Sequence, residues 1–317
     1  MSILITGGAG FIGSNLTEKL LNAGHEVICL DNFNDYYDPQ IKWGNIESYK
    51  KNHKYTLYED NIRNLKALNT IFENHKITTI FHLAARAGVR PSLSDPILYS
   101  QVNIEGTLNL LEMAKKHSIK KFIFASSSSV YGNNKKTPFS EDDNVDFPVS
   151  PYAATKKAGE LLCYNYHHLY NIPIACVRFF TVYGPRQRPE MAIHKFTSLI
   201  SKNQELPVFN NGKCQRDFTY IDDIISGLIN IFNKSDLTYD ILNLGESKTI
   251  STINLIKLIE NELGIKAKLK LMPAQPGDVE KTFADISKAK AKYGYNPQYP
   301  IEKGIKEFVL WYKNKLS

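Results

Sequence analysis

The sequence predicts an α/β fold built on a doubly wound parallel sheet, with a smaller, partly discontinuous α/β lobe toward the C-terminus. Three observations predict it. Short apolar runs alternate with longer amphipathic runs through the first half of the chain, which is the pattern of successive β-α-β units. Runs such as FIFA at 122–125 are apolar throughout, as strands covered on both faces are. The first apolar run leads directly into a glycine-rich loop.

The elements follow in order along the chain. Strands are expected at 3–6, 26–30, 55–59, 79–83, 121–125 and 172–179, and helices at 14–23, 65–74, 102–117 and 152–170. Right-handed crossovers between these strands would place helices on both faces of the sheet. The alternation loosens after residue 180, where we expect a strand and helix over 219–232, a strand from 241, a helix at 252–263, a strand at 266–272 and a final helix from 300.

Charge and cysteine content narrow the class of protein. The formal net charge of the 317 residues is +7, but only 7 of the 39 basic residues are arginine, and the lysines are scattered. A nucleic-acid partner would call for a clustered basic stripe, so none is expected. No apolar run approaches the roughly 18–20 residues that cross a bilayer, and the N-terminus lacks the basic start of a signal peptide. The 4 cysteines show no pairing pattern and the histidines no metal-ligand spacing, which predicts a cytoplasmic protein without a metal.

The glycine-rich loop has the spacing of a dinucleotide site. Gly7, Gly10 and Gly13 follow a strand and open a helix. In such a loop one glycine makes the turn, one lets the backbone approach a pyrophosphate, and one lets helix and strand pack closely. The second strand leads to Asp31, whose carboxylate would accept hydrogen bonds from ribose hydroxyls and disfavour a 2′-phosphate. This order predicts a Rossmann-type NAD site. Asp60, after the third strand, either flanks the adenine or belongs to a plain acidic turn.

A tyrosine, a lysine and a run of serines are the candidate catalytic groups. Tyr152 and Lys156 stand four residues apart at the start of a predicted helix, so they share a face. A nearby ammonium and a positive nicotinamide would stabilise the phenolate, making Tyr152 a proton acceptor and donor for a sugar hydroxyl. The alternative is an ordinary amphipathic helix face. The serines at 126–129 follow a strand and would face the ligand crevice, unless they only bond to local backbone.

Taken together, these residues resemble the extended short-chain dehydrogenase/reductases, in particular the nucleotide-sugar epimerases and dehydratases. The likeness covers the whole chain and is carried by TGGAGFIG at 6–13, Asp31, HLAARAGVRPS at 82–92, NIEGT at 103–107, SSSSVYG at 126–132, YAATK at 152–156, RFFTVYGPRQRP at 178–189, RDFTYIDD at 216–223 and PGDVEKTFAD at 276–285. Within the family the nearest likeness is to the UDP-glucuronate 4-epimerases.

The resemblance implies a domain organisation and a partner. Residues 1–180 would form the NAD-binding Rossmann domain, with 219–243 returning to it. Residues 181–218 and 244–317 would form the nucleotide-sugar lobe. Helices 102–117 and 152–170 would join two copies in a homodimer.

The resemblance also assigns roles residue by residue. Tyr152 would be the catalytic base, Lys156 would bind the nicotinamide ribose, and Ser127 would take the catalytic Ser/Thr position. The expected cofactor-binding residues are Gly7, Gly10, Phe11, Ile12, Gly13, Asp31, Asn32, Asp60, Ile62, Leu83, Ala84, Ala85, Tyr152 and Lys156. The expected substrate-binding residues are Arg90, Ser127, Ser128, Ser129, Tyr152, Thr181, Arg188, Arg216 and Asp278.

One departure within the family points to the reaction type. Dehydratases of this group carry Asp-Glu after the catalytic threonine, and decarboxylases carry Glu just before VYG, whereas this chain has Ser128 and Ser129. Without that carboxyl pair the remaining chemistry is oxidation and re-reduction at one carbon. The resemblance therefore implies 4-epimerisation of UDP-glucuronate to UDP-galacturonate through a transient 4-keto form, with NAD as cofactor.

Arginine placement supports an anionic sugar but leaves rival functions open. Six of the seven arginines, all but Arg63, lie in or beside segments expected at the ligand crevice. Arg188 could bind the C6 carboxylate bidentately, with Ser128 and Ser129 adding hydroxyls, or be a surface turn residue. Arg90 is ambiguous between the diphosphate and the carboxylate. The rivals are a 4-epimerase of UDP-glucose, UDP-N-acetylglucosamine or their uronates, a net NAD-dependent reductase, and a non-catalytic NAD-sensing protein.

Overall fold

The computed structural model describes residues 2–273 and 281–316, and the chain divides into two compact units. The first contains residues 1–133, 143–178 and 228–242, and the second contains residues 134–142, 179–227 and 243–317. The chain therefore passes repeatedly between the units, and each is described separately below.

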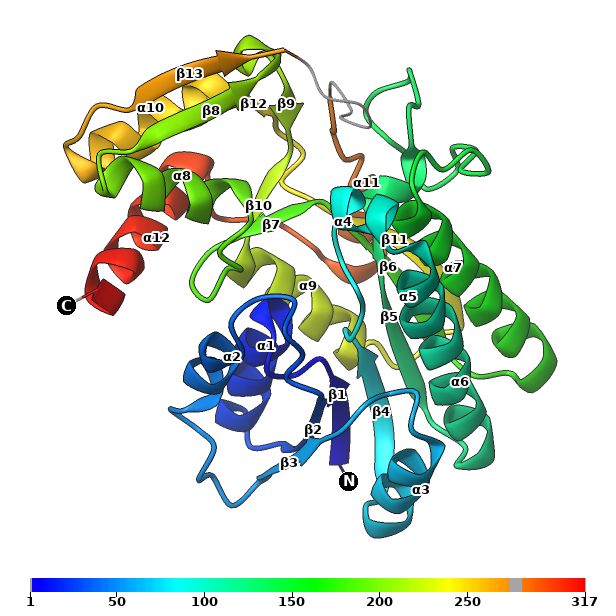
Figure 1. Cartoon of the computed structure of the whole chain (residues 1–317). Helices are drawn as coiled ribbons and strands as arrows, with labels where there is room; N and C mark the ends of the chain where they lie inside the picture. The colour runs from blue at the N-terminus through cyan, green and yellow to red at the C-terminus, as the bar shows by residue number, and fades with distance from the viewer. Residues whose placement is uncertain (1, 274–280, 317) are drawn as a thin grey trace. The chain divides into compact units, whose positions relative to one another are not determined.

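A seven-stranded sheet forms the centre of the first unit (Figure 1). Its strands are β1 (Ser2–Thr6), β2 (Glu26–Asp31), β3 (Tyr55–Glu59), β4 (Ile77–His82), β5 (Lys121–Ser127), β6 (Ile174–Phe179) and β11 (Tyr239–Leu244), in the order β11-β6-β5-β4-β1-β2-β3. The pairs β1–β2, β2–β3, β1–β4 and β4–β5 are parallel. The order runs outward in both directions from β1, which is the doubly wound arrangement and confirms the predicted fold class.

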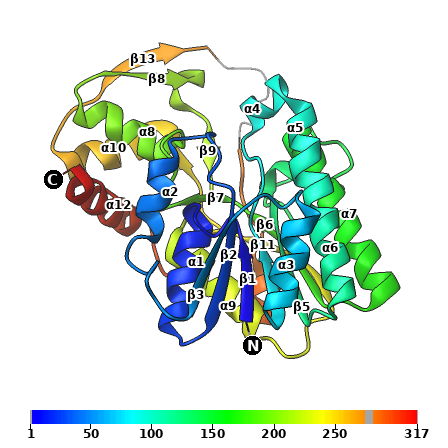
Figure 2. The same ribbon diagram turned by 60° about the horizontal axis from the view of Figure 1, so that its bottom comes forward.

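Helices cover both faces of this sheet. The helices of the first unit are α1 (Phe11–Asn22), α2 (Pro39–Ile46), α3 (Leu65–Asn74), α4 (Val89–Ser94), α5 (Pro96–Ser100), the π-helix η1 (Gln101–Glu105), α6 (Gly106–Lys116), the short 3-10 turn η2 (Ser128–Tyr131) and α7 (Pro151–Tyr170). The helix α9 (Ile221–Asn233) is divided between the two units, and its residues from Leu228 onward belong to the first. Buried side chains of α3, α6 and α7 form one core with Leu4 of β1 and Phe122 of β5, and the three helices lie side by side in Figure 2. Ile5, next to Leu4, is equally buried on the opposite face, as the alternation of side chains along a strand requires.

Two of the predicted helices differ from the sequence prediction in local detail. The first helix begins at Phe11 rather than at residue 14, because Gly10 serves as its N-cap. The predicted helix over 102–117 begins instead as the π-helix η1 and continues as α6. Asn103 lies in that π-turn, where its side-chain amide donates to the carbonyl of Arg86 at 3.0 Å and to the hydroxyl of Thr155 at 3.0 Å. The π-turn thus lets Asn103 join the helix to the segment that contains Arg86 and to α7.

The second unit combines small sheets with helices. Its strands pair as β7 (Thr181–Tyr183) with β10 (Phe218–Tyr220), β8 (Glu205–Phe209) with β13 (Lys268–Met272), both parallel, and β9 (Gln215–Arg216) with β12 (Ile250–Ser251), antiparallel. Its helices are α8 (Ala192–Ser201), the short η3 (Asn210–Gly212), α10 (Thr252–Leu263), α11 (Ser287–Tyr293) and α12 (Ile301–Leu316).

The buried carboxylate of Asp217 joins three segments of the second unit. Asp217 is fully buried and accepts backbone N–H bonds from Glu246 at 2.8 Å, Ser247 at 3.0 Å and Ala284 at 3.1 Å. Burial raises the pKa of Asp217 to about 6, although these donors partly oppose the rise. Asp217 therefore ties the strand that follows Arg216 to two distant loops.

Candidate active site

The candidate cofactor residues come together at one edge of the first unit's sheet. The glycine loop follows β1, Asp31 ends β2, residues 83–85 follow β4, and Ser127 ends β5. Because these strands are parallel neighbours, their carboxyl ends meet at the same edge. That edge is where ligands bind in sheets of this type.

The three glycines of the loop have different surroundings. Gly7 has φ +70°, and a Cβ there would lie 2.8 Å from the backbone nitrogen of Ala84. A Cβ on Gly13 would lie 2.2 Å from the carbonyl oxygen of Gly7. At Gly10, among the residues that the structure describes and apart from its chain neighbours, a Cβ would meet only that same oxygen within 4 Å, at 3.2 Å. Gly7 and Gly13 are therefore packing positions, whereas Gly10 leaves its face open, which fits the approach of a dinucleotide pyrophosphate. Phe11 and Ile12 follow as the first residues of α1.

Asp31 is more fully bonded than the sequence suggested. Its Oδ2 accepts from the backbone N–H of Ala9 at 3.1 Å, and its Oδ1 accepts from the N–H of Phe33 and the Nζ of Lys42, both at 3.0 Å. The Asp31 and Lys42 side chains are 3% and 7% exposed. Through Ala9, the carboxylate thus helps to hold the glycine loop in place. Asn32, the next residue, is exposed. Lys42 was missed because α2 was missed, although an N-capping Asp38 followed by proline is a helix-start signal.

Asp60 and Ile62 have clear structural roles. The carboxylate of Asp60 accepts from the backbone N–H of Asn61 at 2.7 Å and the side-chain amide of Asn64 at 3.0 Å, which is the acidic-turn alternative. Ile62 is 4% exposed and packs against Gly106, where an added Cβ would lie 2.4 Å from the Ile62 side chain. Their contact with adenine stays a prediction.

Beyond β4, residues 83–85 are held against the first strand. Leu83 donates its backbone N–H to the carbonyl of Thr6 at 3.1 Å, and Ala84 donates to the Thr6 hydroxyl at 3.3 Å; Ala85 follows, partly buried. His82, just before them, is buried between the hydroxyls of Thr6 and Thr107, at 2.8 and 2.9 Å. Burial lowers the pKa of His82 to about 3, so this bridge is uncharged. His82 begins the HLAARAGVRPS motif, but the sequence alone assigned it no role.

Tyr152 and Lys156 lie on the first turns of α7, which Ser150 caps by accepting the backbone N–H of Ala153 at 3.1 Å. Lys156 is 4% exposed and donates from Nζ to the carbonyl of Ala125 at 2.8 Å. Its Nζ also lies 5.9 Å from the centre of the Tyr152 ring. Burial lowers the pKa of Lys156 to about 7. The helix thus places a partly neutralised amine at the end of β5, beside the phenol.

The serines divide between two roles. Ser126 donates its hydroxyl to the carboxylate of Glu160 at 2.6 Å. Ser127 N-caps the turn that contains Ser128 and Ser129: its Oγ accepts the backbone N–H of Ser129 at 3.1 Å and donates to the Ser129 hydroxyl at 3.1 Å. Ser127 therefore makes the local hydrogen bonds that the sequence left open as an alternative, and its catalytic role stays a prediction.

The remaining candidates are spread over both units. Arg90 is exposed on α4 of the first unit. In the second unit, Thr181 begins β7, Arg216 lies in β9, and Arg188 pairs with Glu190, whose Oε1 lies 3.0 Å from the arginine Nε. Asp278 lies outside the described residues.

Arg178 does not fit the expectation that the arginines serve the ligand crevice. It was counted with those at or beside the crevice, but its side chain is 1% exposed and its Nε lies 2.8 Å from Oε1 of the equally buried Glu160. Arg178 is therefore an internal ion-pair partner. Arginines in β-strands of buried sheets have such partners, and the apolar run around it gave no hint of one.

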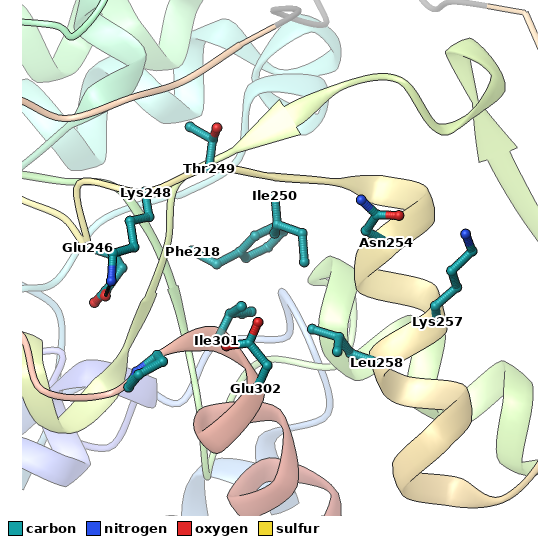
Figure 3. Close-up of a pocket in the computed structure, with 11 residues that line it drawn as sticks. Phe218, Glu246, Lys248, Thr249, Ile250, Asn254, Lys257, Leu258, Ile301 and Glu302 are labelled. Carbon is teal, nitrogen blue, oxygen red and sulfur yellow. Dashed lines mark ion pairs between the residues drawn. The ribbon is translucent and has the colours of Figure 1, made fainter.

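The second unit also contains a pocket of about 560 Å³ (Figure 3). Phe218, Ile250 and Leu258 give it an apolar wall, with Lys257 and Glu302 at its sides. Glu246 also lines it and is 8% exposed, its Oε2 has no hydrogen-bond partner, and burial raises its pKa to about 7. Ile250 pairs with Arg216 across β9 and β12, but none of the assigned site residues that the structure describes lines this pocket.

Within residues 2–273 and 281–316 no helix has both the length and the apolar character that a membrane crossing requires. The same part of the chain holds no group of three or more His, Cys, Asp or Glu side chains suited to a metal ion.

Known proteins resemble the chain over almost its whole length. A family model described as GDP-mannose 4,6 dehydratase matches residues 4–308. A UDP-glucuronate 4-epimerase of Thermodesulfobacterium geofontis is 47% identical, over 99% of this chain and 97% of that protein.

Solved structures agree with these sequence matches. The UDP-glucuronic acid 4-epimerase of Bacillus cereus, in complex with UDP-glucuronic acid and NAD, is 38% identical with a TM-score of 0.93, covering 99% of this chain and 100% of that one. A UDP-glucose 4-epimerase of Thermotoga maritima with UDP-glucose is 32% identical with a TM-score of 0.92, covering both chains fully at 100%. The chain therefore belongs to the nucleotide-sugar epimerase and dehydratase family of the extended short-chain dehydrogenase/reductases.

Proposed function

We propose that this protein is an NAD-dependent 4-epimerase that interconverts UDP-glucuronate and UDP-galacturonate. The observation that carries the proposal is the group at the end of β5. Tyr152 and the buried Lys156 stand beside a strand end that continues into Ser128 and Ser129, where dehydratases and decarboxylases of the family hold carboxyl groups. The relatives named UDP-glucuronate 4-epimerase support the choice of substrate.

The chain's own residues fit the cofactor. The open face of Gly10 and the first turn of α1 would receive the pyrophosphate, and Asp31 would receive the adenosine ribose through the lone pairs its three donors leave. NAD, when bound, supplies a reversible hydride acceptor, so that the sugar passes through a 4-keto form.

Proton movement falls to the first unit's side chains. Tyr152 takes the proton of the C4 hydroxyl and returns it, and Ser127 shares a hydrogen bond with the same oxygen. Lys156 stabilises the phenolate when it is protonated and hydrogen-bonds the nicotinamide ribose, while its bond to Ala125 fixes its direction.

The second unit would hold the rest of the substrate. Thr181 and Arg216 are proposed to contact the diphosphate, Arg90 of the first unit the diphosphate or the carboxylate, and Asp278 the uridine ribose. Arg188 is proposed to bind the C6 carboxylate, aided by Ser128 and Ser129. Its present partner, Glu190, is a carboxylate too, so the substrate would compete with Glu190 for the same guanidinium.

Product analysis by NMR tests the proposal. The protein is incubated separately with UDP-glucuronate, UDP-glucose and UDP-N-acetylglucosamine, and we expect conversion of the first alone. Tyr152→Phe should abolish conversion while NAD stays bound; retained activity would remove Tyr152 from the mechanism. Arg188→Ala should lose activity toward UDP-glucuronate, and Arg188→Lys should recover part of it.

The same experiment separates the rival functions. Conversion of UDP-glucose would make the protein a neutral-sugar epimerase, as in the Thermotoga maritima relative. Stoichiometric consumption of NADH would indicate a reductase. No turnover of any UDP-sugar, with NAD still bound, would leave an NAD-sensing protein.

A homodimer through α6 and α7 is part of the proposal. Leu108 of α6 is 37% exposed, and Leu161 and Tyr164 of α7 are 57% and 53% exposed. Leu161 and Tyr164 are three residues apart and share a helix face, which a second copy would cover. Leu161→Glu should convert the dimer to a monomer in light scattering. Leu310→Glu, at a similarly exposed leucine of α12, should leave the mass unchanged.

A further inference from the structure

Four buried side chains of the first unit form one connected polar network. Arg178 of β6 donates to both carboxylate oxygens of Glu160 on α7, from Nε at 2.8 Å and from Nη2 at 2.9 Å. Its Nη1 donates to the hydroxyl of Tyr131 at 3.0 Å. Ser126 of β5 donates to Glu160 at 2.6 Å. Glu160 and Arg178 are each 1% exposed, so the pair is shielded from bulk solvent.

Stability alone is a poor explanation for such a pair. Removing two ions from water is costly, and well-packed apolar residues in place of a buried ion pair leave a protein as stable or more stable. The other property that a bidentate pair supplies is fixed geometry, because both partners must keep their distances and angles to stay satisfied. The question is therefore which elements this pair fixes.

Two of the elements that the network joins, α7 and β5, carry the proposed catalytic group. Glu160 lies one turn beyond Lys156 on α7, and Ser126 immediately precedes Ser127 on β5. Lys156 itself donates to the carbonyl of Ala125, so two successive residues of β5 are bonded to two side chains one turn apart on α7. This double attachment fixes the register of the helix against the strand end.

Tyr131 extends the attachment to the serine turn. It lies in η2 with Ser128 and Ser129, and its ring also packs under the Arg178 guanidinium, with the guanidinium carbon 4.9 Å from the ring centre. Arg178 therefore holds the far end of the turn that Ser127 caps.

We propose that Glu160 and Arg178 are positioning residues, which through Ser126 and Tyr131 hold Ser127, Tyr152 and Lys156 in the arrangement that proton transfer requires. The inference rests on the proposed function, since it concerns the same catalytic group. None of the four residues needs to touch substrate or cofactor.

Mild variants test the inference without leaving a lone buried ion. Ser126→Ala and Tyr131→Phe each remove one hydrogen bond and keep the pair intact. We expect each to lower kcat about tenfold with KM for the UDP-sugar and NAD retention unchanged, because small displacements at reacting groups act on the rate. Tyr166→Phe is the matched control: Tyr166 is a buried phenol at the other end of α7 that donates to the Glu112 carboxylate. It should lower the melting temperature and leave kcat unchanged.

A double variant removes both charges together. Glu160→Gln with Arg178→Met buries no unpaired ion, and we expect it to fold, retain NAD and lose about a hundredfold in kcat. Wild-type kcat in Ser126→Ala and Tyr131→Phe, or an equal loss in Tyr166→Phe, would overturn the inference. If the double variant does not fold, the two mild variants decide alone.

Failure of the proposed function is distinguishable from failure of this inference. If UDP-glucuronate is not converted but another UDP-sugar is, the proposed substrate is wrong, and the kcat comparison is made with the sugar that is converted. If no sugar is converted, the readout is the phenolate absorbance of Tyr152, taken as NAD-bound wild type minus Tyr152→Phe at one mildly alkaline pH. Loss of this signal in Ser126→Ala, with the signal kept in Tyr166→Phe, supports positioning; an unchanged signal in both refutes it.

Discussion

Replacing Lys156 with methionine should stabilise the NAD-free protein while destroying its activity. Burial lowers the pKa of Lys156 from 10.5 to about 7, so the folded state disfavours the protonated form of this amine. At about 1.4 kcal/mol per pKa unit, this shift lowers the free energy of unfolding of the wild type near pH 7 by about 4 kcal/mol. Methionine keeps the apolar stem but loses the bond to the Ala125 carbonyl. Allowing for that bond, we expect a net gain of about 2 kcal/mol in the free energy of unfolding.

The pH dependence gives this prediction a definite sign. Because the pKa of Lys156 is lower in the folded than in the unfolded protein, the unfolded chain binds more protons between about 7 and 10.5. Wild-type stability therefore rises with pH across this window, and the advantage of Lys156→Met should shrink by about 2 kcal/mol between about pH 7 and pH 9.

Denaturant unfolding of both proteins at these two pH values measures the difference, and NMR product analysis measures activity. A variant less stable than wild type at pH 7, or an advantage that grows with pH, would refute the assignment of a strained, buried amine.

Further predictions concern other parts of the chain. Gly13→Ala should weaken NAD binding at least about tenfold in calorimetric titration, since its Cβ would lie 2.2 Å from the Gly7 carbonyl oxygen, whereas Gly44→Ala, with nothing within 4 Å, should bind normally. Glu246→Gln should gain stability over wild type as pH rises from about 5 to 8, by about 2 kcal/mol, because the raised pKa of Glu246 makes the folded wild type resist deprotonation; a pH-independent difference in denaturant unfolding would contradict this. A thiol reagent should label Cys214 alone in the native protein and all 4 cysteines in denaturant, since the others are buried.

Local sequence was enough for the framework of the fold. The glycines at 7 and 13 are required by close approaches within one loop, and such approaches impose a fixed spacing that can be read directly. The runs of β1, β2, β5 and β6 are long and apolar enough to indicate buried parallel strands. The features that the sequence predicted well depend on residues only a few positions apart in the chain.

The partners of the charged residues could not be predicted in the same way. Asp31 and Lys42 are 11 residues apart, and Glu160 and Arg178 are 18 apart, so each pair forms only once strands and helices have packed. Nothing in the apolar run around Arg178 indicates a carboxylate on α7. Ser127 illustrates a second limit of sequence-based prediction. That a serine can cap a turn is foreseeable, but whether this serine caps the turn or faces the crevice is not.

The position of β11 has a consequence for how the protein is made. This strand is the edge of the seven-stranded sheet, next to β6, yet it comes from residues 239–244, after much of the second unit has been synthesised. A nascent chain that has emerged only to β6 exposes one unpaired edge of a strand that is fully buried in the folded protein, and such an edge is a template for aggregation. Completion of the sheet must therefore wait on the ribosome for about sixty more residues, so this protein is expected to need a holding chaperone during translation more than a protein with contiguous domains does.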